Sequence, residues 1–247
     1  GIGKALARRF DEDGIKSLYL ISRTPSKLTQ TVKEFNDIRK CVTSRQGDII
    51  NFNSIKTIID DIYHIEGAID IWVNNAGQWY PHSLNTSIED LANNLNLIGN
   101  APVLITQYLV QKAIKESKEL KILNILSQAG LWDISGGILD NNLSYGPGKS
   151  LLRSYLFHLE HELELYKDKK IRLYGLFPGT VGTNKLKKEI QSGILKEPIP
   201  VEYVVDASMD LLEDNLLAQN QPTRYLAIKY NSERKCIEKL HYDHKKL

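Results

Sequence analysis

The sequence contains little cysteine and no excess of charge of either sign. Its two cysteines, Cys41 and Cys236, lie far apart in a chain of 247 residues. They therefore indicate neither a disulfide framework nor a metal cluster, and a reducing compartment is expected. Lysine and arginine number 32 against 30 aspartate and glutamate residues, a net charge of +2. This balance argues against a protein that binds nucleic acid or a membrane surface through its overall charge.

Long apolar runs are also missing. The longest run without a charged residue, 91–111, could cross a bilayer, but its six asparagine and glutamine side chains would be costly in hydrocarbon. We therefore predict a soluble helix there. The chain begins at Gly1 rather than at a methionine, so we expect residues to precede it. A targeting segment is thus left open, and the cytoplasm is the default location.

Hydrophobic residues make up 42% of the chain, enough for the core of one domain over residues 1–247. Short apolar runs alternate with segments of helical period. This alternation predicts an α/β fold, a doubly wound parallel sheet with helices on both faces. The string Thr86-Ser87-Ile88-Glu89 has the form of a capping box. Strands are expected at 17–21, 41–45, 68–73, 120–126, 171–177 and 225–228, and helices at 4–10, 27–36, 55–62, 88–115, 151–163 and 204–217.

The start of the chain and the ends of the first two predicted strands suggest a nucleotide site. Gly1-Ile2-Gly3 opens a helix, where backbone N–H groups can bind a pyrophosphate, although a tight packing turn would look the same. Ser22 and Arg23 follow strand 17–21, where an NAD-binding fold usually has an acidic residue. An arginine there suits a 2′-phosphate and favours NADP(H), although a solvated surface charge is the alternative. Asp48 follows strand 41–45 and suits either an adenine amino group or a turn.

Two further motifs follow predicted strands. Asn74-Asn75-Ala76-Gly77 directly follows strand 68–73, where small and amide residues leave space for a ribose; a plain turn is the alternative. We expect these amides to satisfy exposed backbone groups. Ser127 follows strand 120–126, where it could also be an ordinary strand-end hydroxyl.

Tyr-x-x-x-Lys places a phenol and an ammonium one helical turn apart. The spacing alone has little value, because it occurs five times, at Tyr108/Lys112, Tyr145/Lys149, Tyr166/Lys170, Tyr225/Lys229 and Tyr242/Lys246. Only Tyr145 lies at a predicted helix start between strands 120–126 and 171–177, with Ser127 upstream.

Taken together and in this order, these motifs resemble those of the single-domain short-chain dehydrogenase/reductase family, with Pro178-Gly179 as a further match. The resemblance covers nearly the whole chain. It implies a Rossmann-type sheet of about seven parallel strands and NAD(P)-linked hydride transfer at a carbonyl or alcohol. It also places the family's catalytic asparagine on Asn96, which could otherwise be a surface amide, and its nicotinamide-binding threonine on Thr183, with Val181 in the same cofactor-binding segment.

The resemblance assigns a chemical role to four residues. Tyr145 would exchange a proton with the substrate oxygen, and Ser127 would orient that oxygen. Lys149 would favour the phenolate of Tyr145 and bind the nicotinamide ribose. Asn96 would hold a water that relays protons to bulk solvent. No metal is expected.

The chain departs from the family pattern at several places. The family's first strand and first glycine are absent before Gly1, and that strand would lie in the middle of the sheet. Ser127 and Tyr145 are 18 positions apart, more than is usual, with an insertion within 130–144. Pro147 requires Tyr145 to lie at the very start of its helix. The chain ends in a charged tail, 231–247.

The candidate substrate residues lie in loops that follow the predicted strands. Their apolar side chains suggest an apolar or aromatic carbonyl compound, with core or lid packing as the alternative. The loop residues are Trp79, Tyr80, Trp132, Ile134 and Leu139. Residues 184–200 resemble the family's substrate lid.

Helices 91–115 and 151–166 are expected to pair copies of the chain into a homodimer or homotetramer. A non-catalytic binding or assembly module of the same fold is the competing hypothesis for the function.

Overall fold

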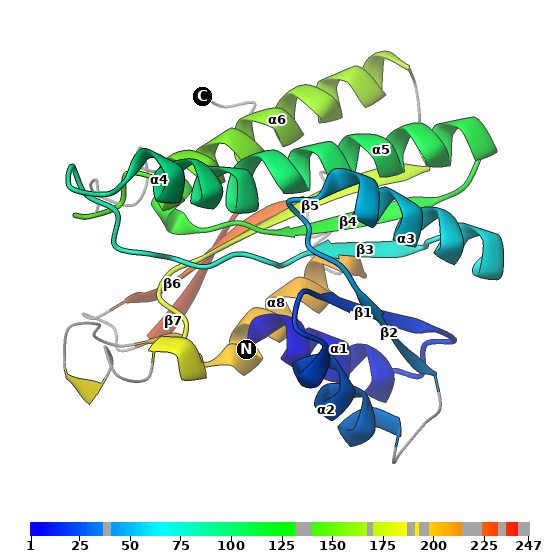
Figure 1. Cartoon of the computed structure of the whole chain (residues 1–247), viewed down its shortest axis with the longest axis horizontal. Helices are drawn as coiled ribbons and strands as arrows, with labels where there is room; N and C mark the ends of the chain where they lie inside the picture. The colour runs from blue at the N-terminus through cyan, green and yellow to red at the C-terminus, as the bar shows by residue number, and fades with distance from the viewer. Residues whose placement is uncertain are drawn as a thin grey trace.

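The computed structural model describes residues 1–36, 41–131, 140–166, 170–186, 191–192, 198–213, 224–231 and 236–241. Helices cover both faces of a twisted sheet, as predicted (Figure 1). None of the described helices is long and apolar enough to cross a membrane.

The main sheet has five strands in the order β3-β4-β5-β6-β7. The first four are parallel, and β7 runs antiparallel to β6. A separate parallel pair is formed by β1 and β2. The strands are β1 (Leu18–Ser22), β2 (Val42–Gln46), β3 (Ile71–Asn74), β4 (Leu120–Ile125), β5 (Ile171–Pro178), β6 (Tyr225–Asn231) and β7 (Cys236–His241).

The sheet differs from the expectation in two respects. Its described strands form two sheets rather than one, and β1 and β3 are only partly buried, whereas β4 and β5 are almost entirely buried. The segment expected to be a charged tail contributes β7. The charged residues of this segment obscure the alternation of apolar and polar residues that is typical of a strand. Ile237 packs against the core, while Lys239 lies on the exposed side and bonds Asp210. Charged side chains of this kind are common on edge strands.

Two apolar cores hold the layers together. On one face of the sheet α3, α5 and α6 pack against β4 and β5, and on the other face α1 and α8 do so. A small third core joins α2 to the β1–β2 pair. The helices are α1 (Ile2–Glu12), α2 (Pro25–Asn36), α3 (Phe52–Glu66), α5 (Ala101–Glu116), α6 (Tyr145–Leu165) and α8 (Val201–Leu212).

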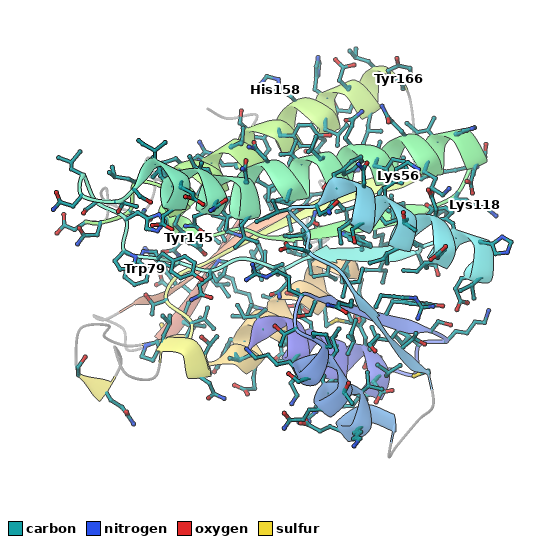
Figure 2. All side chains as sticks on the ribbon, in the orientation of Figure 1. Lys56, Trp79, Lys118, Tyr145, His158 and Tyr166 are labelled. Carbon is teal, nitrogen blue, oxygen red and sulfur yellow. The ribbon has the colours of Figure 1, made fainter. Side chains whose placement is uncertain are left out.

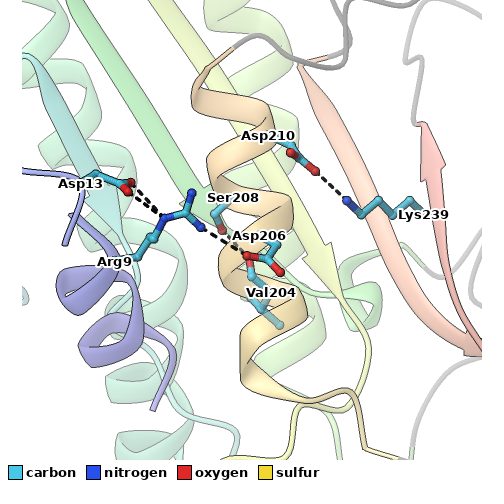
Figure 3. A network of polar contacts seen from close by, with 7 residues as sticks. All are labelled: Arg9, Asp13, Val204, Asp206, Ser208, Asp210 and Lys239. Atoms are coloured by element: carbon cyan, nitrogen blue, oxygen red, sulfur yellow. Dashed lines mark hydrogen bonds and ion pairs between the residues drawn. The ribbon is translucent and has the colours of Figure 1, made fainter. Parts of the chain in front are cut away.

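A polar network joins α1 to α8 (Figure 3). Arg9 Nε bonds both carboxylate oxygens of Asp13 at 3.0 Å, and its Nη1 lies 3.3 Å from Asp206 on α8. Asp210 on α8 bonds Lys239 on β7 at 2.6 Å. Exposed ion pairs contribute little free energy singly. Their effect here is geometric, because they hold the last turn of α1 beside α8 and hold α8 beside β7.

The long helix predicted over 88–115 begins at Ile88, but its N-cap is the second residue of the capping box and it is interrupted after Leu95. Ser87, not Thr86, is the N-cap of α4 (Ile88–Leu95), and its Oγ accepts from Asp90 N at 3.0 Å. The partner acid is therefore Asp90 rather than Glu89. A π-helical turn, η1 (Asn96–Asn100), then separates α4 from α5. Pro102 lacks the N–H for a normal helical bond to residue 98, which gives a physical reason for the irregular turn.

The π turn packs on the first turns of α6 through two glycines. A Cβ at Gly99 would lie 3.2 Å from the carbonyl oxygen of Gly148, and one at Gly148 would lie 2.5 Å from Ile98 Cγ1. Ile98 is fully buried. The two helical segments can approach this closely only because both positions lack side chains.

We expect Gly148→Ala to lower the free energy of unfolding by about 1–3 kcal/mol, because overpacking against Ile98 outweighs the better helix propensity of alanine. Chemical denaturation measures this change. Ile98→Ala is the control: it removes both γ carbons, so the double variant should lose less than the sum of the two single losses. Strict additivity would contradict the proposed contact.

Candidate active site

The first turns of α6 bring the predicted tyrosine and serine together. Ser127 follows β4, caps a short 3₁₀ turn, η2 (Gln128–Gly130), and accepts from Ala129 N at 3.2 Å. Its hydroxyl also hydrogen-bonds the hydroxyl of Tyr145. Tyr145 is the first residue of α6, so Pro147 falls in the first turn, as predicted.

Lys149 lies one turn further along α6, where it is buried. Its Nζ donates to the carbonyl oxygen of Ile125 at 2.6 Å and lies 5.8 Å from the centre of the Tyr145 ring. Burial lowers the pKa of Lys149 to about 8. The ammonium thus faces the ring of Tyr145. It is bound to the last residue of β4, two positions before Ser127.

The electrostatics of Tyr145 differ from the expectation. Burial raises the pKa of the Tyr145 hydroxyl, and the hydrogen bond from Ser127 lowers it by a smaller amount. The expected lowering of the Tyr145 pKa by Lys149 is not seen in this structure. The Lys149 ammonium bonds the Ile125 carbonyl rather than the phenol oxygen. Ser127 is therefore the group that favours ionisation of Tyr145 here.

The other tyrosine–lysine pairs have different surroundings. Tyr108 and Lys112 both bond the carboxylate of Asp60 on α3. Lys170 donates to the Ser117 carbonyl at 3.1 Å, beyond the end of α6. Tyr225 is buried in β6, and Tyr242/Lys246 lies outside the described residues. Among the described pairs, only Tyr145/Lys149 lies beside Ser127.

Asn96 is the first residue of the π turn. Its Oδ1 accepts a hydrogen bond of 2.7 Å from Asn100 Nδ2, and the π turn packs against the start of α6. π turns inserted in α-helices occur frequently at functional sites. The proposed water-binding role of Asn96 stays a prediction.

A line of close contacts joins the start of α1 to Lys149. A Cβ at Gly3 would lie 2.4 Å from the side-chain nitrogen of Asn75, so Gly3 and Asn75 touch. A Cβ at Gly77 would lie 3.7 Å from Lys149 Nζ. Gly77 and Ala76 are exposed beyond the end of β3. Three predicted cofactor-binding elements are thus adjacent: the glycine turn, the segment after β3, and Lys149.

The start of α1 also borders a cleft of about 620 Å³. Gly1, the N-cap of α1, has no side chain to bond the helix's first N–H groups, which suits an anion at that end. Ile2 points instead to the core beneath the sheet. Thr183 and Asn184 also line this cleft. Its other lining residues belong mostly to α1 and α8, so only the part of the cleft at Gly1 and Thr183 coincides with predicted cofactor-binding residues.

The segment after β5 is held in place by backbone bonds. Pro178 ends β5, and Gly179 N donates to the Ile228 carbonyl at 2.9 Å. Val181 forms a parallel bridge with Ile199, and Thr183 N donates to the Val181 carbonyl at 2.7 Å. The Val181–Ile199 bridge brings together the two ends of the expected lid, 184–200, most of which lies outside the described residues.

Arg23 and Asp48 come together beyond β1 and β2. Their side chains are 60% and 40% exposed, and Arg23 Nη1 lies 3.7 Å from Asp48 Oδ2. Ser22 Oγ accepts from Thr24 N at 3.4 Å. Asp48 also accepts from Ile50 N at 3.1 Å, so it forms the turn that was the alternative interpretation. The guanidinium is accessible to a ligand phosphate, with one carboxylate competing for it.

Asn74 acts within the sheet rather than on the cofactor side. It accepts from Trp72 Nε1 at 2.8 Å and donates to Thr106 Oγ1 and Asn124 Oδ1 at 2.9 and 2.8 Å. The expectation that its amide satisfies exposed backbone groups is wrong, since its partners are side chains. The hydrogen-bonded amide ties β3 to β4 and α5 immediately before the Asn75–Gly77 turn.

The predicted substrate residues are only partly described. Trp79 and Tyr80 are exposed in the loop after β3, and Figure 2 shows Trp79 at the same end of the molecule as Tyr145. Trp132, Ile134 and Leu139 lie outside the described residues. No cluster of three or more metal-ligating side chains occurs in the described part of the chain.

A buried polar group next to Tyr145 was not predicted from the sequence. His82, Asn94 and Ser144 are joined by hydrogen bonds, and Ser144 directly precedes Tyr145. A signal was present, since Asn94 and Ser144 each lie within two residues of a predicted catalytic residue. Their contact could not be read from spacing, because it joins segments about 50 positions apart.

Several known proteins are similar to this chain. The family model described as short chain dehydrogenase matches residues 1–193. Glucose 1-dehydrogenase 2 of Bacillus subtilis is 25% identical over 188 residues, which is 74% of this chain and 69% of the relative. The next two curated relatives are matched over only 38% and 39% of their own length.

Solved structures show the same fold. A short chain dehydrogenase from Bacillus anthracis superposes with a TM-score of 0.74 at 23% identity, covering 87% of this chain and 86% of the other. A metagenomic short-chain oxidoreductase in complex with NADP superposes with a TM-score of 0.68 at 22% identity, covering 85% of each chain.

The buried lysine makes stability depend on pH. The folded protein releases the Lys149 proton near pH 8, whereas the unfolded chain releases it near 10.5. Between these values the unfolded state binds more protons, so folding is stabilised as pH rises. We expect the stability of the wild type relative to Lys149→Met to increase between pH 7 and pH 10.5, by at most about 3 kcal/mol.

Denaturation of both proteins across this pH range measures the effect. The comparison cancels titrations that the two proteins share. A constant difference between the wild type and Lys149→Met would contradict a lowered pKa for Lys149.

Proposed function

Because the chain belongs to the short-chain dehydrogenase/reductase family, we propose that it is an oxidoreductase that transfers a hydride between NADP(H) and a carbonyl or secondary alcohol. The observation that carries this proposal is the contact of the Tyr145 and Ser127 hydroxyls, with Lys149 buried behind them. These groups lie at the carboxyl end of β4, the edge where parallel sheets bind ligands.

The chain's own residues supply binding and proton transfer. The bound nicotinamide supplies the hydride. Gly1, Gly3 and Asn75–Gly77 would hold its phosphates and riboses, and Thr183 its carboxamide. Tyr145 gives its hydroxyl proton to the substrate oxygen in reduction and takes it back in oxidation. Ser127 donates a hydrogen bond to that oxygen, and Asn96 holds a water that returns a proton to Tyr145.

The preference for NADP(H) rests on Arg23. Arg23 is exposed beyond β1, and the neighbouring Ser22 is a hydroxyl rather than the acid that suits a free ribose. A guanidinium binds phosphate through short, charge-assisted hydrogen bonds. The 3.7 Å contact with Asp48 is an exposed and weak ion pair, which a doubly charged phosphate can replace.

The substrate would be an apolar or aromatic carbonyl compound. Trp79 exposes ring surface at the end of the molecule that carries Tyr145 (Figure 2), and the next residue, Tyr80, is exposed as well. Residues 184–200 are proposed as the substrate lid. A homodimer or homotetramer would form through the exposed apolar side chains of α5 and α6, namely Leu104, Ile114 and Leu151.

We expect Tyr145→Phe to reduce kcat by about 10²–10⁴-fold, since it removes the acid–base group, while NADPH affinity changes little. Tyr108→Phe is the matched control, because Tyr108 is also followed by a lysine four residues later but bonds Asp60. Turnover is followed by NADPH absorbance with a panel of aromatic ketones and aldehydes.

The control should keep its kcat and lose only some stability. Equal kcat in wild type and Tyr145→Phe would refute the assignment. A well-folded wild-type protein that neither binds nor oxidises NADPH would favour the non-catalytic binding module.

Cofactor choice is tested separately. Arg23→Ala should weaken NADPH binding about 10- to 100-fold, as expected for loss of charge-assisted hydrogen bonds, and leave NADH binding almost unchanged. Lys118→Ala removes the same charge just beyond the end of α5, far from Tyr145, and serves as control (Figure 2). Calorimetric titration gives the dissociation constants. Parallel losses for both cofactors would show that Arg23 does not bind the 2′-phosphate.

A further inference from the structure

Three buried polar side chains form a hydrogen-bonded chain directly beside Tyr145. Ser144 Oγ lies 2.8 Å from His82 Nδ1 and accepts a hydrogen bond of 2.7 Å from Asn94 Nδ2. Ser144 is fully buried, and His82 and Asn94 are 9% and 4% exposed. The three residues come from the loop after β3, the last turn of α4 and the residue before α6.

Ser144 is not used as serines at helix starts normally are. It occupies the N-cap position of α6, where a serine oxygen usually accepts from a backbone N–H of the first turn. Here Asn142 Oδ1 takes that role, accepting from Gly146 N at 3.1 Å. The Ser144 hydroxyl bonds His82 and Asn94 instead. The start of α6 is thus attached to two other segments through this one oxygen.

The donors and acceptors give the chain a direction. Because Asn94 donates to the Ser144 oxygen, the single Ser144 proton can be donated to Nδ1 of a neutral His82. The proton of that imidazole then resides on Nε2. Asn94 Oδ1 is buried without a partner among the described residues. The hydrogen bond to Ser144 therefore holds this amide in place. Buried polar atoms without a partner, such as Asn94 Oδ1, are uncommon in proteins.

We propose that His82 is a positioning residue that holds Tyr145, through Ser144, in the orientation in which it meets Ser127. The proposal rests on the function proposed above. Ser144 is adjacent to Tyr145, and Asn94 lies two residues before Asn96, so the same oxygen sets both proton-transfer residues relative to one another.

His82 also connects this chain to the substrate side. Its ring stacks on Tyr80, with centroids 5.9 Å apart and planes 13° apart. The His82 carbonyl accepts from Leu143 N at 3.1 Å, which keeps the two loops together even without the imidazole. A change in the His82 side chain should therefore alter the position of Tyr145 more than it alters the fold.

The test compares His82→Leu, which removes the acceptor, with His82→Asn, whose Oδ1 can accept from Ser144 in place of Nδ1. With NADPH and the best aromatic ketone of the panel, we expect His82→Leu to reduce kcat about 10- to 100-fold, since misplaced reacting groups lose rate. The KM for NADPH should not change. His82→Asn should recover most of the lost kcat, and melting temperatures of both variants report on folding.

Equal losses of kcat in the two variants, or wild-type kcat in His82→Leu, would overturn the positioning role. Tyr145→Phe and the wild type separate this outcome from a failure of the proposed function: an inactive wild type overturns both proposals, whereas an active wild type with unaffected His82→Leu overturns only this one.

The imidazole can also be observed without substrate. In nitrogen-15 spectra of the wild-type protein at pH 8, His82 should carry its proton on Nε2, and Ser144→Ala should abolish this preference. A wild-type His82 protonated on Nδ1 would overturn the assigned direction of the chain. This readout holds even where His82→Leu fails to fold.

Discussion

The start of α6 is the constraint on which the rest of the site depends. Pro147 has no N–H to give to a preceding turn, so the helix cannot extend far to its amino-terminal side, and Tyr145 becomes its first residue. One turn later Lys149 reaches the Ile125 carbonyl at the end of β4. A tyrosine one position earlier or later on this helix would have its phenol rotated by about 100° away from Ser127.

The π turn and two glycines transmit this constraint to the neighbouring helix. Gly99 and Gly148 allow backbone contact between η1 and α6, so the turn that begins at Asn96 lies against the turn that begins at Tyr145. The position of Asn96 is thus determined by packing, not by its place in a regular helix. Closely packed interiors transmit such constraints because they deform little.

The sequence predicted the parts of the fold that depend on local patterns. Strand ends marked by Asn75–Gly77, Ser127 and Pro178-Gly179 were found where the apolar runs stopped, and Pro147 correctly located the start of α6. Two features were not predicted, because neither leaves a signal in the pattern of apolar residues on which the prediction relied. Strand β7 has a charged, half-exposed sequence. The π turn follows from a hydrogen bond that Pro102 cannot make.

The two tyrosine–lysine pairs on helices α5 and α6 show why spacing alone cannot identify a site. Lys112 lies beside the Asp60 carboxylate, and the bonds from Lys56, Tyr108 and Lys112 hold the pKa of Asp60 far below its usual range. That charge is neutralised by its neighbours and serves to join α3 to α5. Among the described residues, Lys149 Nζ donates only to the Ile125 carbonyl, and burial lowers its pKa. Burying an ammonium without a carboxylate costs stability, which natural proteins tolerate chiefly where a site uses the charge. The difference between the two pairs therefore lies in the third residue that each meets, and that residue comes from a distant part of the chain.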